Sequence, residues 1–194
     1  MDQGLAPRFV TLVPASREGS IRWHPVRERL RSTVDSVDAV RDLDDEQLLH
    51  SLDWNRSVVV RKLDGLTYET ATKLRTPTGL TLLGVVRHLA WDERGWFEHF
   101  LLGEHDDAVE IDASFAVDSV SSVDEVVADY LAAVERSREI VRQQPSFGVR
   151  SVLPHDYFGI VTLRWILLHM TTETTRHAGH MDILRELTDG QTGY

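Results

Sequence analysis

The sequence predicts an all-α protein that folds as a four-helix bundle, and three observations support this prediction. Four long segments place apolar residues three and four positions apart, which is the period of an amphipathic helix. Strand-like alternation of apolar and polar residues is almost absent. The chain of 194 residues is long enough to bury one real core. A bundle is the simplest way for four such helices to bury their apolar faces together.

Composition excludes several classes of function. The net charge is −10, with 31 acidic against 21 basic residues, which argues against nucleic acid as the main partner. There are no cysteines, so disulfides, thiolate ligands and a cysteine nucleophile are excluded, and any thiol chemistry needs a thiol supplied by a ligand. No apolar run is long enough for a signal peptide or a membrane span. We therefore expect a cytoplasmic protein without a membrane partner.

The first segment, 1–42, is expected to be an irregular N-terminal arm, and 43–194 the bundle. Four helix-breaking residues interrupt any periodicity in the arm: Gly4, Pro7, Pro14 and Gly19. The arm also holds a basic cluster in an otherwise acidic chain, formed by Arg17, Arg22, Arg27, Arg29 and Arg31. We interpret this cluster as a solvated face of an arm packed on the domain rather than as a partner-binding surface.

The first two bundle helices have recognisable beginnings. Asp44 opens the first one, with acidic residues where the helix dipole favours them, and Gly65 is its expected stop. Pro77 and Gly79 then predict a turn. Thr81 can cap a second helix that continues to about residue 102.

A long acidic connection, 103–121, should lead to the third helix. Ser122 begins that helix with a capping-box pattern, and Pro145 ends it. The segment 147–160 predicts a loose hairpin or an extended crossover. Thr162 caps the fourth helix, which continues to about Leu187.

The fourth helix carries polar residues on its apolar side. Glu173, His177 and His180 are spaced by four and three, so on a helix they point the same way. The same face carries Leu163, Ile166, Met170, Thr174, Met181 and Leu184. Buried charge is costly unless it is paired or bound to a metal. We therefore expect either polar partners or a metal ion in the core.

A metal site can be completed from the second helix. His88 lies at the edge of that helix's apolar face, and with Glu173 and His177 it makes a set of three nitrogen and oxygen ligands. Three protein ligands and an open position are typical of catalytic zinc, and Ni²⁺, Fe²⁺ or Mn²⁺ accept the same atoms. Asp92 and His180 are candidates for a fourth ligand or for hydrogen-bond partners of the ligands. A structural Glu173–His177 pair explains the spacing equally well.

The chain resembles the DinB-like superfamily in two stretches, GLTLLGVVRHLAWDERGWFEHFLLGE and LRWILLHMTTETTRHAGHMDILRELTDGQTG. Within it, the chain is most similar to the branch of the mini-circle protein and the mycothiol-dependent maleylpyruvate isomerase. The pattern E-T-x-R-H-x-G-H-x-D in the fourth helix is typical of that branch. The resemblance covers about 44–193. It implies a DinB-like bundle with a divalent metal, most often zinc and sometimes nickel, held by His88, Glu173 and His177.

The resemblance also implies a function. Its members largely transfer low-molecular-weight thiols, so we expect a metal-dependent transferase that activates a mycothiol-like thiol for attack on an electrophile. The alternatives are a non-catalytic metal- or ligand-binding bundle of the stress response, as a homodimer, and a bundle whose polar core is only structural. Metal content separates the last alternative from the others, and thiol consumption separates the first two.

Overall fold

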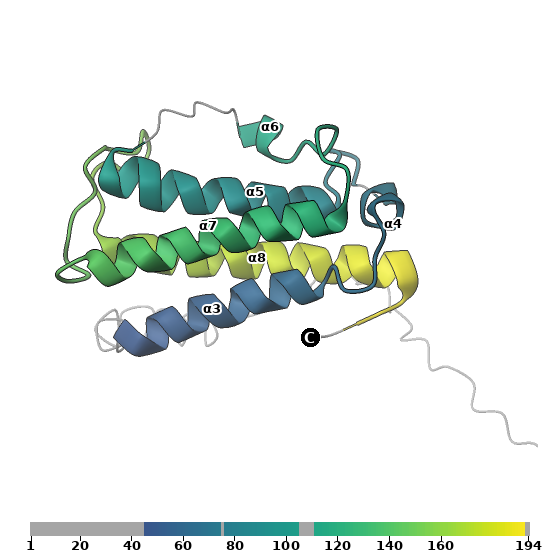
Figure 1. Cartoon of the computed structure of the whole chain (residues 1–194), viewed down its shortest axis with the longest axis horizontal. Coiled ribbons are helices and arrows are strands. Elements are labelled where there is room, and N and C mark those ends of the chain that lie inside the picture. Colours follow the sequence, from purple (N-terminus) through teal and green to yellow (C-terminus); the bar gives the residue numbers. More distant parts are fainter. Residues whose placement is uncertain (1–44, 75, 105–110, 193–194) are drawn as a thin grey trace, which may run out of the picture. The chain divides into compact units, whose positions relative to one another are not determined.

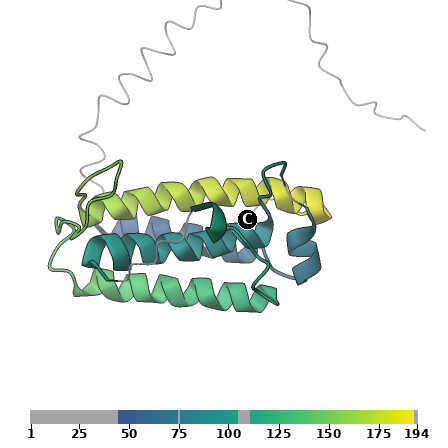
Figure 2. The ribbon, with the colours of Figure 1, turned by 90° about the horizontal axis from the view of Figure 1, so that it is seen from above.

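The four predicted helices lie side by side in the computed structural model, which describes residues 45–74, 76–104 and 111–192 (Figures 1 and 2). They are α3 (Asp45–Arg61), α5 (Leu82–Arg94), α7 (Val123–Gln143) and α8 (Leu163–Asp189). Helix α5 packs mainly on α7 and also touches α8, while α3 packs on α8. The predicted all-α bundle is confirmed. The predicted arm, 1–42, lies outside the described residues.

The helix beginnings follow the capping residues that the sequence predicts. The hydroxyls of Thr81, Ser122 and Thr162 each accept a hydrogen bond from the backbone N–H three residues further on. Each bond satisfies one of the free donors in the first turn of its helix. Helix α8 ends at Gly190, whose φ of 79° is a conformation that suits glycine.

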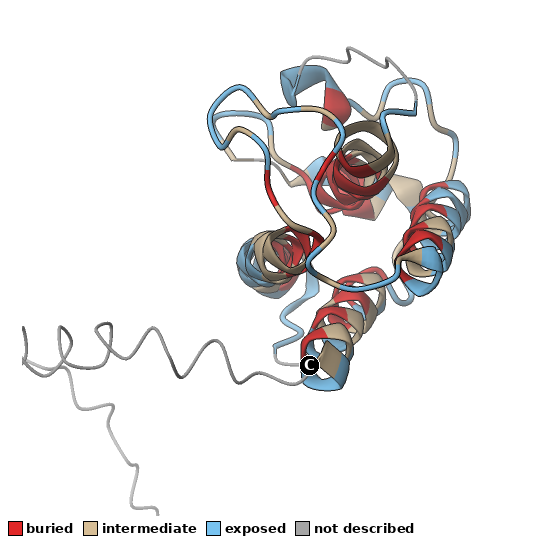
Figure 3. Cartoon of the chain, turned by 90° about the vertical axis from the view of Figure 1, so that its left-hand side faces the viewer, coloured by how far each residue is buried: buried red, intermediate tan, exposed pale blue. Residues whose placement is uncertain are grey.

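The apolar core has two parts, separated by a polar layer. One part contains Val86, Tyr130 and Met181, and the other contains Phe97 and Met170, among further buried side chains. Figure 3 shows the buried residues on the inward sides of the helices. Between the two parts, α5 and α8 place six polar side chains: His88, Asp92, Glu93, Glu173, Thr174 and His177. The candidate site therefore lies in the middle of the bundle.

The second helix changes its winding at Gly95. The segment η1 (Gly95–Leu101) is a π-helix that continues α5, whereas the sequence predicts one regular helix over this range. A π-helical turn inserts an additional residue and reorients the side chains that follow, and such turns are frequent at functional sites. Trp96 and Phe100, whose ring centroids lie 5.0 Å apart, come from this segment.

The connections contain short structure that periodicity does not reveal. Helix α6 (Ile111–Ser114) lies in the predicted connection 103–121. Helix α4 (Tyr68–Lys73) lies between the expected stop at Gly65 and the predicted turn at Pro77, where the sequence predicts no helix. Both helices are too short for an amphipathic repeat to appear. The expected hairpin before α8 is present only as two isolated bridges, Arg150 with Thr162 and His155 with Gly159. None of the described helices combines the length and apolarity that a bilayer crossing needs.

Candidate functional site

Two imidazole rings from facing helices meet in the polar layer. His88 on α5 and His177 on α8 lie with their ring centroids 4.9 Å apart, at an angle of 61°. Their exposed fractions are 4% and 7%. The prediction that His88 lies at the edge of the apolar face is therefore wrong, because the neighbouring connection covers that side of α5.

The covering residue is Ser114 of α6. Its hydroxyl lies 2.7 Å from His88 Nδ1 and donates its own proton to the carbonyl of Ile111 at 2.5 Å. Since that proton is already used, the hydroxyl accepts from Nδ1–H. His88 then carries its proton on Nδ1, and Nε2 keeps a free lone pair. Burial, and next the charge of His177, lower the pKa of His88 to about 3, so the ring is neutral at pH 7.

The free nitrogen of His88 faces a carboxyl group. Asp92 Oδ2, one turn along α5, lies 3.3 Å from His88 Nε2. Burial, followed by the charges of Glu173 and Glu93, raises the pKa of Asp92 to about 8. At pH 7 the carboxyl group therefore holds a proton that it can donate to Nε2. Asp92, a candidate for a fourth ligand or for a hydrogen-bond partner of the ligands, lies beside His88.

His177 has no such partner. Its Nδ1 atom is buried and has no hydrogen-bond partner among the described residues. Its Nε2 atom lies 3.9 Å from Glu173 Oε2, too far for a hydrogen bond. Burial, followed by His180 and Arg176, lowers the pKa of His177 to about 4. A buried neutral imidazole with an unused nitrogen is an available ligand for a cation.

Of the three polar residues predicted to share one face of α8, only His177 is buried. Glu173 has a side chain 17% exposed, and it forms an ion pair with the exposed Arg176 at 3.0 Å. His180 is exposed, with its ring 5.4 Å from that of His177. The expectation that all three point to the apolar side of the helix is wrong for His180, which is exposed, while Glu173 is only partly buried. Spacings of four and three spread residues across a helix face, and the neighbouring helices cover only part of it.

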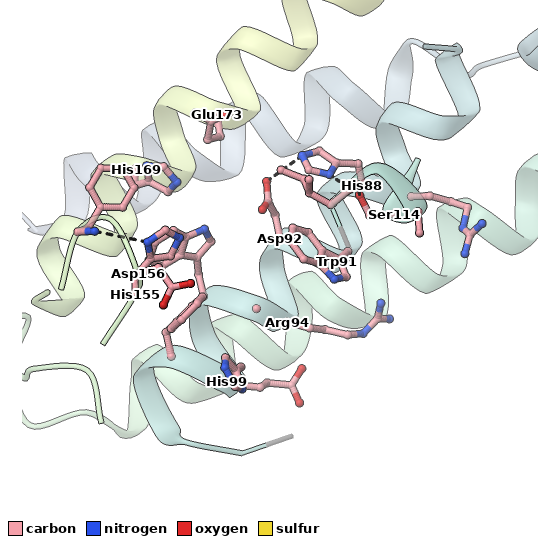
Figure 4. A pocket seen from close by; sticks show the side chains of 18 of the residues that line it. His88, Trp91, Asp92, Arg94, His99, Ser114, His155, Asp156, His169 and Glu173 are labelled. Carbon is pink, nitrogen blue, oxygen red and sulfur yellow. Dashed lines mark hydrogen bonds and ion pairs between the residues drawn. The ribbon is translucent and has the colours of Figure 1, made fainter. Parts of the chain in front are cut away.

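A cavity of about 960 Å³ opens next to this layer (Figure 4). His88, Asp92 and Ser114 lie together on one side of it, and His155 and His169 lie on the other. Its wall includes Arg87, Trp91, Arg94, Trp96, His99, Phe100, Phe158, Glu173 and Arg176. Sequence reasoning assigned no role to His99 or His155, because each stands alone in the chain without a ligand-like spacing.

The structure brings together part of the predicted metal set. In the described residues, no three histidine, aspartate or glutamate side chains stand in a metal-holding arrangement. The assignment of His88, Glu173 and His177 as ligands therefore stays a prediction. His177 Nδ1 has no partner among the described residues, and His88 Nε2 carries a lone pair that faces Asp92. Both nitrogens fit a divalent cation chemically, because neutral imidazole is a common ligand of zinc and nickel.

Comparison with known families connects this geometry to a class of proteins. A family model for mycothiol-S-transferase matches residues 47–190, a range that includes all three predicted ligands. No curated protein matches the chain. The match agrees with the resemblance drawn from the second and fourth helices. The chain belongs to the mycothiol-S-transferase family.

Proposed function

We propose that the protein is a metal-dependent transferase that joins a mycothiol-like thiol to an electrophilic substrate. One observation carries the proposal. Two buried neutral imidazoles from facing helices, His88 and His177, lie with their ring centroids 4.9 Å apart, and His88 lines an open cavity. Of their ring nitrogens, His177 Nδ1 is buried without a hydrogen-bond partner among the described residues. A purely structural core would be expected to satisfy that His177 nitrogen with a polar partner.

The candidate ligands are His88 through Nε2, His177 and Glu173. A bound divalent cation such as zinc or nickel would lower the pKa of a thiol and so supply a thiolate nucleophile at neutral pH. Glu173 now pairs with Arg176, so its carboxylate would exchange that partner for the metal. Asp92 stands next to His88 and is a further candidate for holding the metal or its ligands.

The chain's own groups prepare this site. Ser114 holds the His88 ring in the tautomer that leaves Nε2 free. The rings of Phe115 and Trp91 stack against His88 at 3.9 and 5.7 Å and fix its plane. Arg87 and Arg176 contribute positive charge to the cavity wall, which suits a thiolate or an anionic cosubstrate.

Metal content tests the first half of the proposal. The protein is purified without a nickel column, and its metals are measured by mass spectrometry before and after zinc titration. We expect about one equivalent for the wild type and a large loss for His177→Ala. His50→Ala is the matched control, since it removes an exposed imidazole from α3. Less than about a tenth of an equivalent in the wild type, with no affinity on titration, would eliminate the metal site.

Thiol transfer tests the second half. Metal-loaded protein is mixed with mycothiol and an electrophile, and the thioether product is followed over time. We expect turnover by the wild type and by His50→Ala, and little by His177→Ala. Equal rates for wild type and His177→Ala would remove the enzyme hypothesis. One equivalent of metal without thiol consumption would instead support the non-catalytic binding bundle.

A further inference from the structure

The cavity has a second end that the proposed function leaves unassigned. Six rings gather there, which we call the aromatic cluster: Trp96, Phe100, His155, Phe158, Trp165 and His169. All except Trp165 line the cavity. They come from three separate segments, namely η1, the connection before α8, and α8 itself. Figure 4 shows His155 and His169 on the side opposite His88.

Trp96 is the centre of the aromatic cluster. Its ring centroid lies 4.6 Å from that of His169, 5.1 Å from His155 and 5.4 Å from Trp165. Trp96 is 5% exposed, so the indole is fixed, whereas Phe158 is 41% exposed at the outer side. Ring distances of this size are typical of favourable aromatic packing.

Two pairs within the cluster are stacked in parallel. His155 lies on Trp96 at an interplanar angle of 11°, and His169 lies on Trp165 at 9°. Each imidazole therefore covers one face of an indole. A cation would bind best over an open indole face, which these stacks restrict. A further flat ring, in contrast, can extend such a stack.

The rest of the cavity wall supports a flat ligand. Ile111 and Ala113 are its only aliphatic side chains among the described residues, and the other apolar surface belongs to rings. An aliphatic substrate would be matched by branched aliphatic side chains, while rings favour a planar partner in an offset or edge-on arrangement. The aromatic end and the His88 end belong to one continuous cavity.

We propose that the aromatic cluster is the electrophile subsite and that it takes a planar, electron-poor aromatic ring bearing a leaving group. Electron-poor rings stack well on electron-rich rings such as the partly exposed Phe158, and they are also the arenes that thiolates attack. With 1-chloro-2,4-dinitrobenzene as probe, the sulfur bonds to the ring carbon that carries chlorine. The carbon–chlorine bond breaks, chloride leaves with the electron pair, and the thiol proton passes to the buffer. This inference rests on the proposed function.

Equilibrium dialysis tests the subsite without any reaction. The probe is 2,4-dinitroaniline, which has no leaving group, and the protein is the full chain without added thiol or metal. We expect saturable binding by the wild type and affinity three- to tenfold weaker for Phe158→Ala, about the effect of losing one stacked ring. Tyr157→Ala is the matched control, because Tyr157 is 85% exposed on the same connection and does not line the cavity.

Three results would overturn the inference. One is the absence of saturable binding of dinitroaniline to the wild type. Another is equal affinity of Phe158→Ala and Tyr157→Ala. The third is tighter binding of tetramethylammonium than of dinitroaniline, which would identify a cation cage instead. Thermal melting of both variants verifies that each is folded, as expected for two exposed side chains.

Kinetics separates this inference from the proposed function. With mycothiol as the thiol, we expect Phe158→Ala to raise the KM for chlorodinitrobenzene three- to tenfold and to leave the rate with iodoacetamide unchanged, since iodoacetamide has no ring. If the variant reacts with each electrophile as well as the wild type does, the proposed subsite is disproved and the transferase proposal stands. If neither reacts with the wild type, the transferase is lost, and dialysis still decides the subsite.

Discussion

At His88, one hydroxyl group decides which ring nitrogen carries the proton. Ser114 accepts from Nδ1–H because its own proton is given to a backbone carbonyl. The same bond fixes the ring's orientation between α5 and α6. Partners of this kind, which do not touch the metal themselves, raise the affinity of a metal-binding imidazole.

We therefore predict that Ser114→Ala weakens zinc binding about 10- to 100-fold, the usual effect of removing such a partner. The fold should lose only about 1 kcal/mol, the value of one hydrogen bond. Competition with a chelator measures the affinity, and urea unfolding measures the stability. Ser119→Ala, at an exposed position of the following turn, is the control and should leave the zinc affinity unchanged. Unchanged affinity in Ser114→Ala would contradict the role given to this hydroxyl.

The buried ionisable groups also give the metal-free protein a pH-dependent stability. The pKa values of His88 and His177 fall from 6.5 to about 3 and 4, so below pH 6.5 the unfolded chain binds more protons there than the folded one. The stability that comes from keeping these two histidines neutral is fully present above pH 6.5, and it is lost as the pH falls from 6.5 toward 3. Asp92 acts oppositely, because its pKa rises from 3.8 to about 8 and the folded state keeps a proton that the unfolded state loses.

The sum of these effects predicts a stability maximum near pH 6.5. Between pH 4 and 6.5 the unfolded chain gains two protons at the histidines and the folded chain keeps one at Asp92, so the free energy of unfolding rises with pH. Between pH 6.5 and 8 only Asp92 differs between the two states, and the free energy of unfolding falls by up to about 1.4 kcal/mol per pH unit. Urea unfolding at several pH values measures both limbs. Asp92→Asn should remove the decline above pH 6.5, and a decline of the same slope in that variant would disprove the assignment.

Among the elements, α5 depends on a glycine for its contact with the connection that carries Ser114. A Cβ atom built on Gly84 would lie 2.6 Å from the carbonyl oxygen of Phe115, closer than atoms can approach. Phe115 follows Ser114 directly, and its ring stacks on His88 at 3.9 Å. Glycine at this position therefore lets the connection lie against α5 one turn before His88.

We predict that Gly84→Ala destabilises the protein by about 1–3 kcal/mol, the usual cost of overpacking, and also weakens zinc binding, since the backbone at Phe115 must move. Gly179→Ala on α8 is the matched control, because a Cβ atom there meets nothing within 4 Å. That variant should gain up to about 1 kcal/mol from helix propensity. Melting curves and chelator competition measure both effects, and equal stability of the two variants would refute the close approach.

At the scale of the whole molecule, a buried ion pair in the described part of the chain joins α3 to α5. Arg56 contacts both carboxylate oxygens of Glu93 at 2.8 and 2.6 Å, and neither side chain is more than 6% exposed. The carboxylate is fully buried within the polar layer, and its charge helps to raise the pKa of Asp92. The ion pair that joins α3 to α5 therefore also affects the protonation of Asp92 in the candidate site.

We predict that Glu93→Ala costs about 3–5 kcal/mol, because it leaves Arg56 charged and unpaired in the interior. The double variant Arg56→Met with Glu93→Leu should recover much of that loss. Arg94→Ala, which breaks the exposed pair with Asp129, should cost less than about 1 kcal/mol. Urea unfolding measures all three, and a similar cost for the buried and the exposed pair would contradict the argument.

Local features of the sequence predict much of this protein. Thr81, Ser122 and Thr162 begin helices as expected, because a cap and an amphipathic repeat are properties of neighbouring residues. The pairing of second-helix and fourth-helix residues was also expected, and His88 and His177 do meet. The spacing on α8 predicts that Glu173 and His180 lie on the apolar side, but Glu173 is only partly buried and His180 is exposed. Helical spacing tells which residues share a face, but not how much of that face the neighbouring helices cover.

The sequence by itself therefore determined four amphipathic helices, their capped beginnings, the absence of a thiol within the chain, and the family. Tertiary structure decided the burial of His88, its pairing with Ser114, the π-helical turn at Gly95 and the aromatic cluster around Trp96. These features depend on residues far apart in the chain that meet only after the helices pack. Such contacts produce no periodicity, capping residue or spacing within one segment, so they cannot be predicted from the sequence of that segment.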